Sequence, residues 1–560
     1  MHNGYSYNLI LLGGTGAKCG ESFIHMCANG YFEGDRINIL YIDSDNQNGN
    51  ARNFKRVYEI YQKCQKRYMI AQNSNSPFQT KIRLKIVDPV ENNVEYFKDF
   101  LYMGGSTNTT KSAKALMEAL YSEEEMNMKI SDGFFAHPNV GAAVLAANME
   151  NVLADFYNNI VQDQADMKQI RIFILGSVFG GTGAASLPTL ARYFKDKLVG
   201  GSSNRRIKEQ VKIGGCMVLP YFSFLREEQK DNEEEDFSIE AGKFPTKTRS
   251  ALDYYKYVDE KKNDRPFDEL YILGHDGNDA RGVYATMGNE QRNLPHIVEL
   301  YGAMAAVTFF ESNIRKNGYY FATVSVNKIK WGEGYKRNKG YFQFLVMMRF
   351  AIVIKSLILE ELFDYTEQNK LRVTAREIPW YYDFLDGKDK SSDMDTQLLY
   401  SKFEDIARFC DEYIRWFAEL NLANIDKLKY LEEIDYKEDS DDLVGYLSLF
   451  SKEILLKQHH NNQICKGIVN LEKNVANNVY KENLRFIREN LQNLDGPQAY
   501  TDFKSQNITM DQIWSRLCDA GFSSFVVDDD IFKNISKSKD KSMDACVKNL
   551  VNAIFCACLI

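Results

Sequence analysis

The sequence predicts an α/β protein, in which a mainly parallel sheet flanked by helices is followed by a mainly helical C-terminal domain. Three observations predict this. Short apolar runs alternate with helix-length segments from about residue 7 to residue 330, which is typical of parallel sheets. Two of the runs end in glycine-rich turns, and from about residue 340 long helical segments with few glycines replace the alternation. Because 560 residues exceed the size of one core, we place domains at residues 1–312 and 313–560.

Six apolar runs in the first domain are the predicted strands: Tyr7–Leu12, Ile37–Ile42, Ile82–Val87, Ile170–Leu175, Val211–Pro220 and Phe267–Leu273. Ligands of such sheets bind outside the carboxyl ends of the strands, so that edge is the predicted site. In the second domain, the predicted helices include Tyr400–Leu420, Val444–Leu456 and Ile468–Leu491.

Composition argues against several classes of partner. With 69 basic and 77 acidic residues the net charge is −8, and no basic block stands out, so we expect no nucleic-acid partner. The start, Met1–Tyr7, is polar, and the most apolar stretch, Phe342–Phe363, carries four charges, so we expect neither a secretory leader nor a membrane segment. Ten cysteines without any C-x-x-C pair indicate reduced thiols of a cytoplasmic protein.

The two glycine-rich turns, Gly13–Gly16 and Gly180–Gly183, each follow a predicted strand and open a predicted helix. Glycine lets the backbone approach a phosphate closely, and a helix N-terminus offers free N–H groups to it. Two such loops converging at one sheet edge predict a polyphosphate ligand. Taken singly, each is also compatible with a tight strand-to-helix turn. The first is not a Walker A loop, and as a dinucleotide fingerprint its glycine spacing is one residue too long, with Asp43 arriving 27 residues after Gly16.

Six segments in chain order resemble the tubulin/FtsZ superfamily. The turn Gly13–Gly20 is similar to its first nucleotide loop, and Gly180–Ala184 is similar to its signature phosphate loop. Gly133–Gly141 is similar to the Ala-Asn-Pro-x-x-Gly loop that faces the γ-phosphate. The other three matches are Asp43–Gln47 near the phosphate and its cation, Pro220–Phe224 near the ribose, and Asn293–Glu299 at the start of the central helix that contacts guanine. The helical second half resembles the non-cytoskeletal bacterial branch.

The resemblance implies a GTP/GDP site with Mg²⁺, and ATP stays open as the alternative nucleotide. Backbone N–H groups of the two glycine loops are expected to hold the phosphates, with Thr182 adding a hydroxyl and Lys18 a charge. Asp45 is expected to hold Mg²⁺ through water. The residues implied in nucleotide binding are Gly13, Gly14, Thr15, Gly16, Lys18, Gly20, Glu21, Asp43, Asp45, Asn46, Gln47, Ala136, His137, Pro138, Gly180, Gly181, Thr182, Gly183, Ala184, Asn293 and His296.

Three departures bear on mechanism. Phe179 and Ala185 replace glycines of the signature loop, and Glu21 stands where relatives carry an asparagine that faces the base. The stretch 312–332, after the central helix, contains no acidic residue, whereas tubulin-type polymers place a catalytic acidic loop there. We therefore assign no catalytic residue and expect hydrolysis to be slow.

The predicted function is GTP binding with a slow GTPase activity, read out by the helical domain through self-association, as an oligomer, or through a protein partner. Two alternatives stay open at this point. One is an NAD(P)-dependent oxidoreductase built on the first glycine loop and Asp43, which leaves Gly180–Ala184 without a role. The other is a non-catalytic structural or interaction protein on a degenerate tubulin fold.

Overall fold

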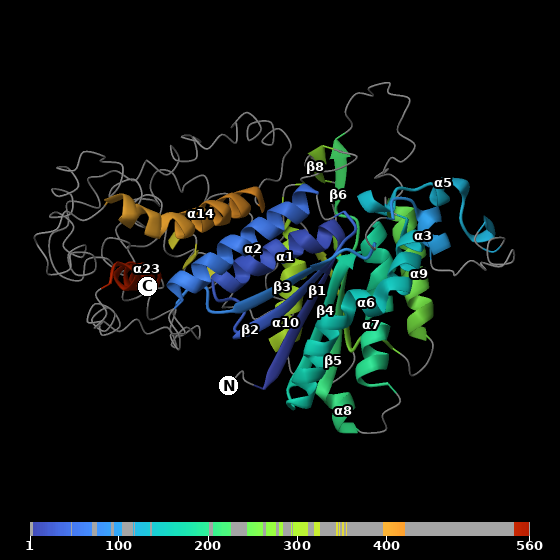
Figure 1. Ribbon diagram of the computed structural model, residues 1–560, viewed down its shortest axis with the longest axis horizontal. Coiled ribbons are helices and arrows are strands. Elements are labelled where there is room, and N and C mark those ends of the chain that lie inside the picture. Colours follow the sequence, from blue (N-terminus) through green and yellow to red (C-terminus); the bar gives the residue numbers. More distant parts are fainter. Residues whose placement is uncertain are drawn as a thin grey trace, which may run out of the picture. The chain divides into compact units, whose positions relative to one another are not determined.

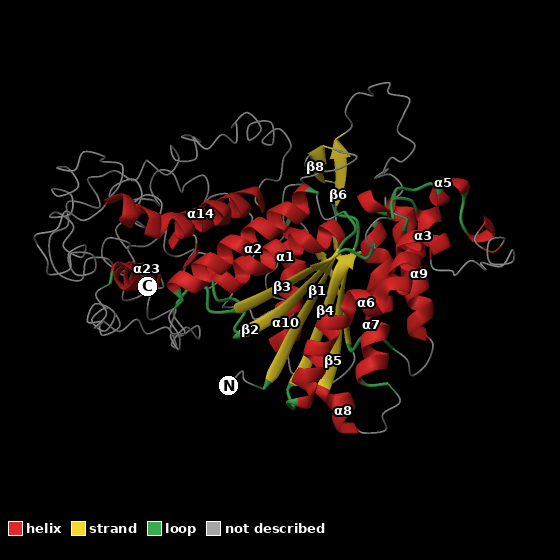
Figure 2. Cartoon of the chain, in the orientation of Figure 1, coloured by secondary structure: helices red, strands yellow, loops and turns green. Residues whose placement is uncertain are grey.

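Helices cover both faces of a seven-stranded sheet in the computed structural model of the chain (Figure 1, Figure 2). The structure describes residues 4–45, 48–69, 76–90, 94–103, 116, 118–134, 137–200, 205–225, 244–260, 265–275, 279–283, 293, 295–311, 318–324, 343–344, 346–347, 350–351, 354, 396–420 and 542–558. The strands are β1 (Tyr5–Leu12), β2 (Arg36–Ile42), β3 (Lys81–Val87), β4 (Gln169–Ser177), β5 (Val211–Val218), β6 (Phe222–Leu225), β7 (Glu269–His275), β8 (Asp279–Val283) and β9 (Gly318–Val324).

The helices between the strands vary widely in length. They are α1 (Gly13–Ala28), α2 (Gly49–Tyr68), α3 (Phe97–Met103), α5 (Glu123–Met126), the 3₁₀ helix η1 (Ile130–Asp132), α6 (Pro138–Ala165), α7 (Gly181–Leu198), α8 (Arg205–Gln210), α9 (Phe244–Glu260) and α10 (Ile297–Glu311). Beyond β9 the named elements are the helices α14 (Thr396–Leu420) and α23 (Met543–Cys558). Of the three predicted C-terminal helices, Tyr400–Leu420 is confirmed, and the other two lie outside the described residues.

The sheet has the order β3-β2-β1-β4-β5-β7-β9, and all six predicted strands belong to it. Parallel pairing joins β2 to β1, β1 to β4, β4 to β5, β5 to β7 and β7 to β9, which confirms the mainly parallel α/β fold. The seventh strand, β9, begins past the predicted domain boundary at residue 312 and was not among the predicted strands. Strands β6 and β8 form a separate parallel pair.

Alternate side chains of the central strands enter different hydrophobic layers, as the pleat of a strand requires. Ile10 and Ile172 belong to a buried cluster with α6 and α7, and both helices lie along one side of the sheet (Figure 1). Tyr7 and Phe173 instead contact Phe310 of α10, with ring centroids 5.4 and 6.2 Å apart. Burial on both faces explains why these strands read as continuous apolar runs in the sequence.

The chain divides into two compact units, and α1 and α2 contribute residues to both. The first unit, residues 1–23, 34–56 and 82–325, holds the sheet. The second contains residues 24–33, 57–81 and 326–560, so the ends of α1 and α2 belong with α14 and α23. Arg67 of α2 pairs with Asp405 of α14 at 2.9 Å, and Asn552 of α23 donates to the carbonyl of Tyr68 at 2.7 Å.

His25, near the end of α1, is fully buried in the second unit. Its ring centroid lies 4.6 Å from that of Trp416, 5.3 Å from that of Tyr413 and 5.6 Å from that of Phe409. Neither ring nitrogen has a hydrogen-bond partner in the part of the chain that the structure describes. Burial lowers the pKa of this imidazole to about 3, so the ring is neutral at physiological pH. None of the described helices is long and apolar enough to span a bilayer.

Candidate functional site

The strand order reverses its direction between β1 and β4. From β1 the chain continues to β2 and β3 on one side, and from β4 it continues to β5, β7 and β9 on the other. In open α/β sheets such a reversal leaves a crevice at the carboxyl ends of the strands, where ligands bind. Helix α1 begins at Gly13, directly after β1, and α7 begins at Gly181, four residues after β4. No side chain caps the start of α7, whose N-cap is Gly180. The two glycine turns therefore open two helices beside this crevice.

The first glycine turn lies against the second. A Cβ atom placed on Gly13 would lie 3.5 Å from Cβ of Thr182, and one on Gly176 would lie 3.2 Å from Cα of Gly183. A Cβ on Gly183 itself would overlap the backbone of Ser177. Gly13 also has φ +67°, in the left-handed region that favours glycine. Glycine is thus required by conformation at Gly13 and by close packing at Gly176 and Gly183.

The third predicted loop, Gly133–Gly141, packs against the second. A Cβ on Gly181 would lie 2.7 Å from Cβ of Phe134, and one on Gly141 would lie 3.3 Å from the carbonyl oxygen of Gly181. At its other end, a Cβ on Gly133 would lie 3.5 Å from Cβ of Asp45. Ala136 of this loop, and Asn46 and Gln47 beside Asp45, lie outside the described residues.

The segment before α10 reaches the same region through Asn50 of α2. The amide nitrogen of Asn50 would lie 3.7 Å from a Cβ on Gly14, and its Oδ1 accepts a hydrogen bond from the backbone N–H of Asn293 at 3.0 Å. Most of the other predicted residues lie at helix starts: Thr15 and Gly16 on α1, Pro138 at the first position of α6, and Ala184 on α7, whereas Gly20 and Glu21 lie in the middle of α1. Segments far apart in the sequence therefore meet at one sheet edge.

Asp43, directly after β2, is buried and shared by two elements. Its Oδ1 accepts a hydrogen bond from the Thr182 hydroxyl and its Oδ2 one from the Tyr41 hydroxyl, both at 3.0 Å. Burial and the negative charge of Asp45 raise its pKa to about 7, although both hydrogen bonds oppose this rise. The Thr182 hydroxyl, expected to face a phosphate, thus donates to Asp43.

Lys18 forms a buried ion pair with Glu299 of α10. The same Glu299 oxygen accepts a hydrogen bond from the Tyr221 hydroxyl, and the other accepts one from the backbone N–H of His296 at 2.8 Å. His296 is fully buried, and its ring lies 5.0 Å from that of Tyr221 and 4.8 Å from that of His275. Lys18, predicted as a phosphate contact, therefore joins α1 to α10 through a partner that sequence reasoning missed.

His137 is the N-cap residue of α6, and its Nδ1 lies 3.3 Å from Oε1 of Glu125. Glu125 was not among the predicted site residues. It lies in the run Glu123–Glu125, and acidic runs are usually solvent-exposed, so only the spatial pairing with His137 distinguishes it. Among the described residues, no three His, Cys, Asp or Glu side chains gather as a metal-binding group, so the Mg²⁺ assignment to Asp45 stays a prediction.

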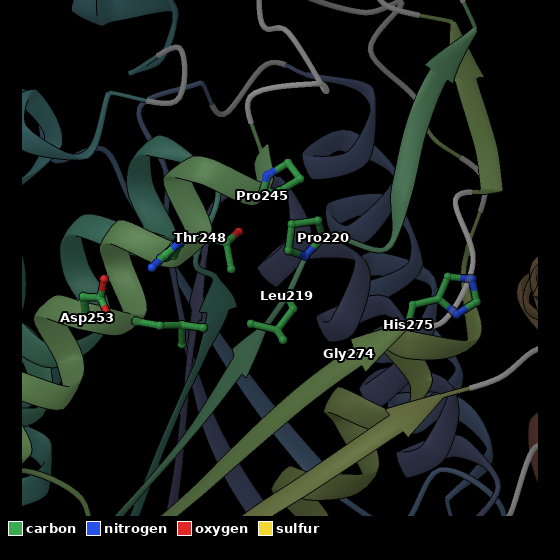
Figure 3. A pocket seen from close by; sticks show the side chains of 9 residues that line it. Leu219, Pro220, Pro245, Thr248, Asp253, Gly274 and His275 are labelled. Atoms are coloured by element: carbon green, nitrogen blue, oxygen red, sulfur yellow. The ribbon is translucent and has the colours of Figure 1, made fainter.

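A pocket of about 470 Å³ opens at the carboxyl ends of β5 and β7, beside α9 (Figure 3). Leu219 and Pro220 line it from the end of β5, Gly274 and His275 from the end of β7, and Thr248 from α9. Pro220 precedes Tyr221, and His275 contacts His296, so the pocket adjoins the Lys18–Glu299 network.

The search of protein-family models and that of curated proteins found no match to this chain. A solved structure, CetZ from Methanosaeta thermophila strain DSM 6194, shares 11% sequence identity with it and superimposes with a TM-score of 0.22. The match covers 54% of this chain and 52% of that one, so this chain spans about half the length of the matched structure.

Proposed function

We propose that this chain is a tubulin-like protein that binds GTP with Mg²⁺ and hydrolyses it slowly. The observation that carries the proposal is the meeting of the α1 and α7 starts at the crevice between β1 and β4. Two helix N-termini and their glycine turns offer a polyphosphate several backbone N–H groups and two positive dipole ends. The order of the matching segments in the sequence supports a tubulin-like nucleotide site over an unrelated one.

The exposure of the loops fits this role. Gly14, Thr15, Gly180 and Ala184 are partly exposed, although the residues around them are buried, so their backbones are accessible to a ligand. Ser44 Oγ and Asn293 Oδ1 are buried at the same edge and have no hydrogen-bond partner among the described residues. Native proteins rarely leave buried polar atoms unpaired, so a ligand or its water would satisfy both.

Asp43 and Asp45 support the placement of the cation. After burial, repulsion by the negative charge of Asp45 is the main cause that raises the pKa of Asp43. A hard divalent cation held by Asp45 through water would relieve that repulsion and would neutralise charge on the phosphates.

The arrangement at Asp43 disfavours the NAD(P) alternative. That alternative uses Asp43 to bind a ribose, but both carboxylate oxygens already accept hydrogen bonds from this chain, and the residue is 5% exposed. The NAD(P) alternative also assigns no role to the second glycine turn, although Thr182 of that turn lies beside Gly13.

The test is equilibrium binding of a fluorescent GTP analogue with and without Mg²⁺, in competition with GTP, ATP and NAD. We expect GTP to displace the analogue more effectively than ATP, and NAD to leave it bound. Gly181→Val should abolish binding because its side chain would overlap Phe134, whereas Gly274→Ala, whose Cβ has no neighbour within 3.5 Å, should bind like the parent. A parent protein with no affinity for either triphosphate would refute the proposal.

We further propose that the helical C-terminal region responds to the bound nucleotide through self-association or through a protein partner. Light scattering and electron microscopy with a non-hydrolysable GTP analogue should reveal nucleotide-dependent self-association. If the nucleotide changes neither the oligomeric state nor partner binding, the non-catalytic structural reading is preferred.

A further inference from the structure

The carboxylate of Glu125, on α5, contacts three groups that hold it in place. Its Oε1 accepts a hydrogen bond from the Asn139 amide at 2.6 Å and lies 3.3 Å from Nδ1 of His137. Its Oε2 accepts one from the backbone N–H of Ser122 at 2.9 Å, and the Ser122 hydroxyl in turn caps the helix. This capping box and the Asn139 contact leave the carboxylate little freedom to move away from His137.

The charge on Glu125 is stabilised by the same contacts. Burial alone would raise its pKa, but the hydrogen bonds from Asn139, Ser122 and His137 outweigh burial and bring its pKa below the usual value. An ionised carboxylate beside Nδ1 favours the tautomer with the proton on that nitrogen. Nε2 then carries a lone pair, and no described residue occupies it. The side chain of His137 is 29% exposed, so water has access to it.

The backbone of His137 belongs to the loop that packs on the start of α7. Its N–H donates to the carbonyl of Phe134 at 2.6 Å, and Phe134 is the residue that a side chain on Gly181 would overlap. Its carbonyl accepts from Gly141, which also lies against Gly181. His137 thus lies at the N-terminus of α6, directly beside the loop that opens α7.

We propose that His137 is the general base of nucleotide hydrolysis in this chain and that Glu125 is its positioning residue, an inference that rests on the proposed GTP site. Nε2 takes a proton from a water molecule whose oxygen attacks the γ-phosphorus. The new P–O bond forms as the bond from the γ-phosphorus to the β-phosphate bridging oxygen breaks, and GDP leaves with that electron pair. Inorganic phosphate is released, and the imidazolium returns its proton to solvent.

This assignment makes hydrolysis a property of one subunit. The acid-free stretch 312–332 would supply no water-orienting group to a neighbouring molecule, whereas the His137–Glu125 pair is carried by the chain that binds the nucleotide. The specific GTPase activity should therefore stay constant as the protein concentration is raised.

The experiment measures phosphate release and nucleotide affinity on the same full-length preparations. His137→Gln should lower kcat by about 10²–10⁴-fold, the range that general-base catalysis supplies, and should bind the fluorescent GTP analogue within about twofold of the parent. Glu125→Gln should lower kcat less than His137→Gln does and should leave the KM for GTP within about twofold of the parent, because the carboxylate orients the His137 ring without touching the nucleotide. Glu124→Gln, on the exposed side of the same helix, is the matched control and should hydrolyse GTP like the parent.

The outcomes separate this inference from the proposed function. A parent that binds GTP but does not hydrolyse it, or a His137→Gln variant that hydrolyses it at the parental rate, overturns the assignment of His137 and leaves nucleotide binding intact. If His137→Gln also loses affinity, the kinetics of Glu125→Gln decide, and a Glu125→Gln variant with the parental kcat overturns the inference. A parent that binds no nucleotide overturns the proposed function itself.

Discussion

Lowering the pH from 7 to 5 should destabilise the protein through one buried side chain, His25. The imidazole has no exposed surface, and its two nitrogens have no hydrogen-bond partner among the described residues. Burial lowers its pKa from 6.5 to about 3. Between these two pH values the imidazole is protonated in the unfolded chain and neutral in the folded chain. The free energy of unfolding therefore has its full value above pH 6.5 and decreases as the pH falls toward 3.

The magnitude follows from the two pKa values. One pKa unit corresponds to about 1.4 kcal/mol, so the whole interval from 6.5 to about 3 corresponds to roughly 5 kcal/mol. The experiment covers only the upper part of this pH interval. From pH 7 to pH 5 the expected loss in the free energy of unfolding is about 2 kcal/mol.

Urea denaturation followed by far-UV circular dichroism at pH 7, 6 and 5 measures this loss in the parent and in His25→Leu. Leucine has a similar volume and no titrating atom. As the pH falls from 7 to 5, the free energy of unfolding of the variant should therefore rise by about 2 kcal/mol relative to that of the parent. Phe409→Leu, in the same cluster, should be destabilised equally at each pH. An identical pH dependence for His25→Leu and the parent would refute the reasoning.

Three further changes test other contacts. Gly183→Ala should lower the free energy of unfolding by about 1–3 kcal/mol and weaken GTP binding, because its Cβ overlaps the end of β4, and urea denaturation and the fluorescent analogue measure both. Lys18→Met should cost about 3–5 kcal/mol by leaving Glu299 buried without its cation, and combining it with Glu299→Met in a double-mutant cycle should restore much of the loss. Without added Mg²⁺, parental GTP affinity should fall as the pH rises from 6 to 8, because a carboxyl with a pKa of about 7 becomes an anion near the phosphates, whereas Asp43→Asn should bind equally across that range.

The fold was largely predictable because burial on both faces leaves a strong local signal. Runs such as Leu9–Leu12 and Ile172–Leu175 are apolar at every position, and each ends at a glycine turn. Strand β9 was missed because Gly318–Val324 mixes glycine and threonine with aromatic residues and lies past the central helix, where a loop was expected. Its place in the sheet depends on pairing with β7, which no local pattern indicates.

The backbone part of the candidate site was predictable for a similar reason, since glycine spacing is a local property. The side-chain partners were not. Lys18 and Glu299 are 281 residues apart, and nothing near Lys18 distinguishes a buried ion pair from a phosphate contact. Asp43 was expected to face a ligand, but whether its oxygens are free depends on Thr182, which reaches it only after β1 and β4 have paired.

The pairing of β1 with β4 also determines when the sheet can form during synthesis of the chain. Leu12 lies opposite Gly176, so this edge of β1 must wait until 164 further residues have been synthesised. At typical rates of translation this delay is on the order of 10 to 30 s. During that time β1 can pair with β2 on one edge only, and its other edge and the first glycine turn lack their partners in β4 and α7, which exposes the nascent chain to aggregation. Slower folding and dependence on chaperones are the expected consequence of placing the first strand in the interior of the sheet, beside a strand made much later.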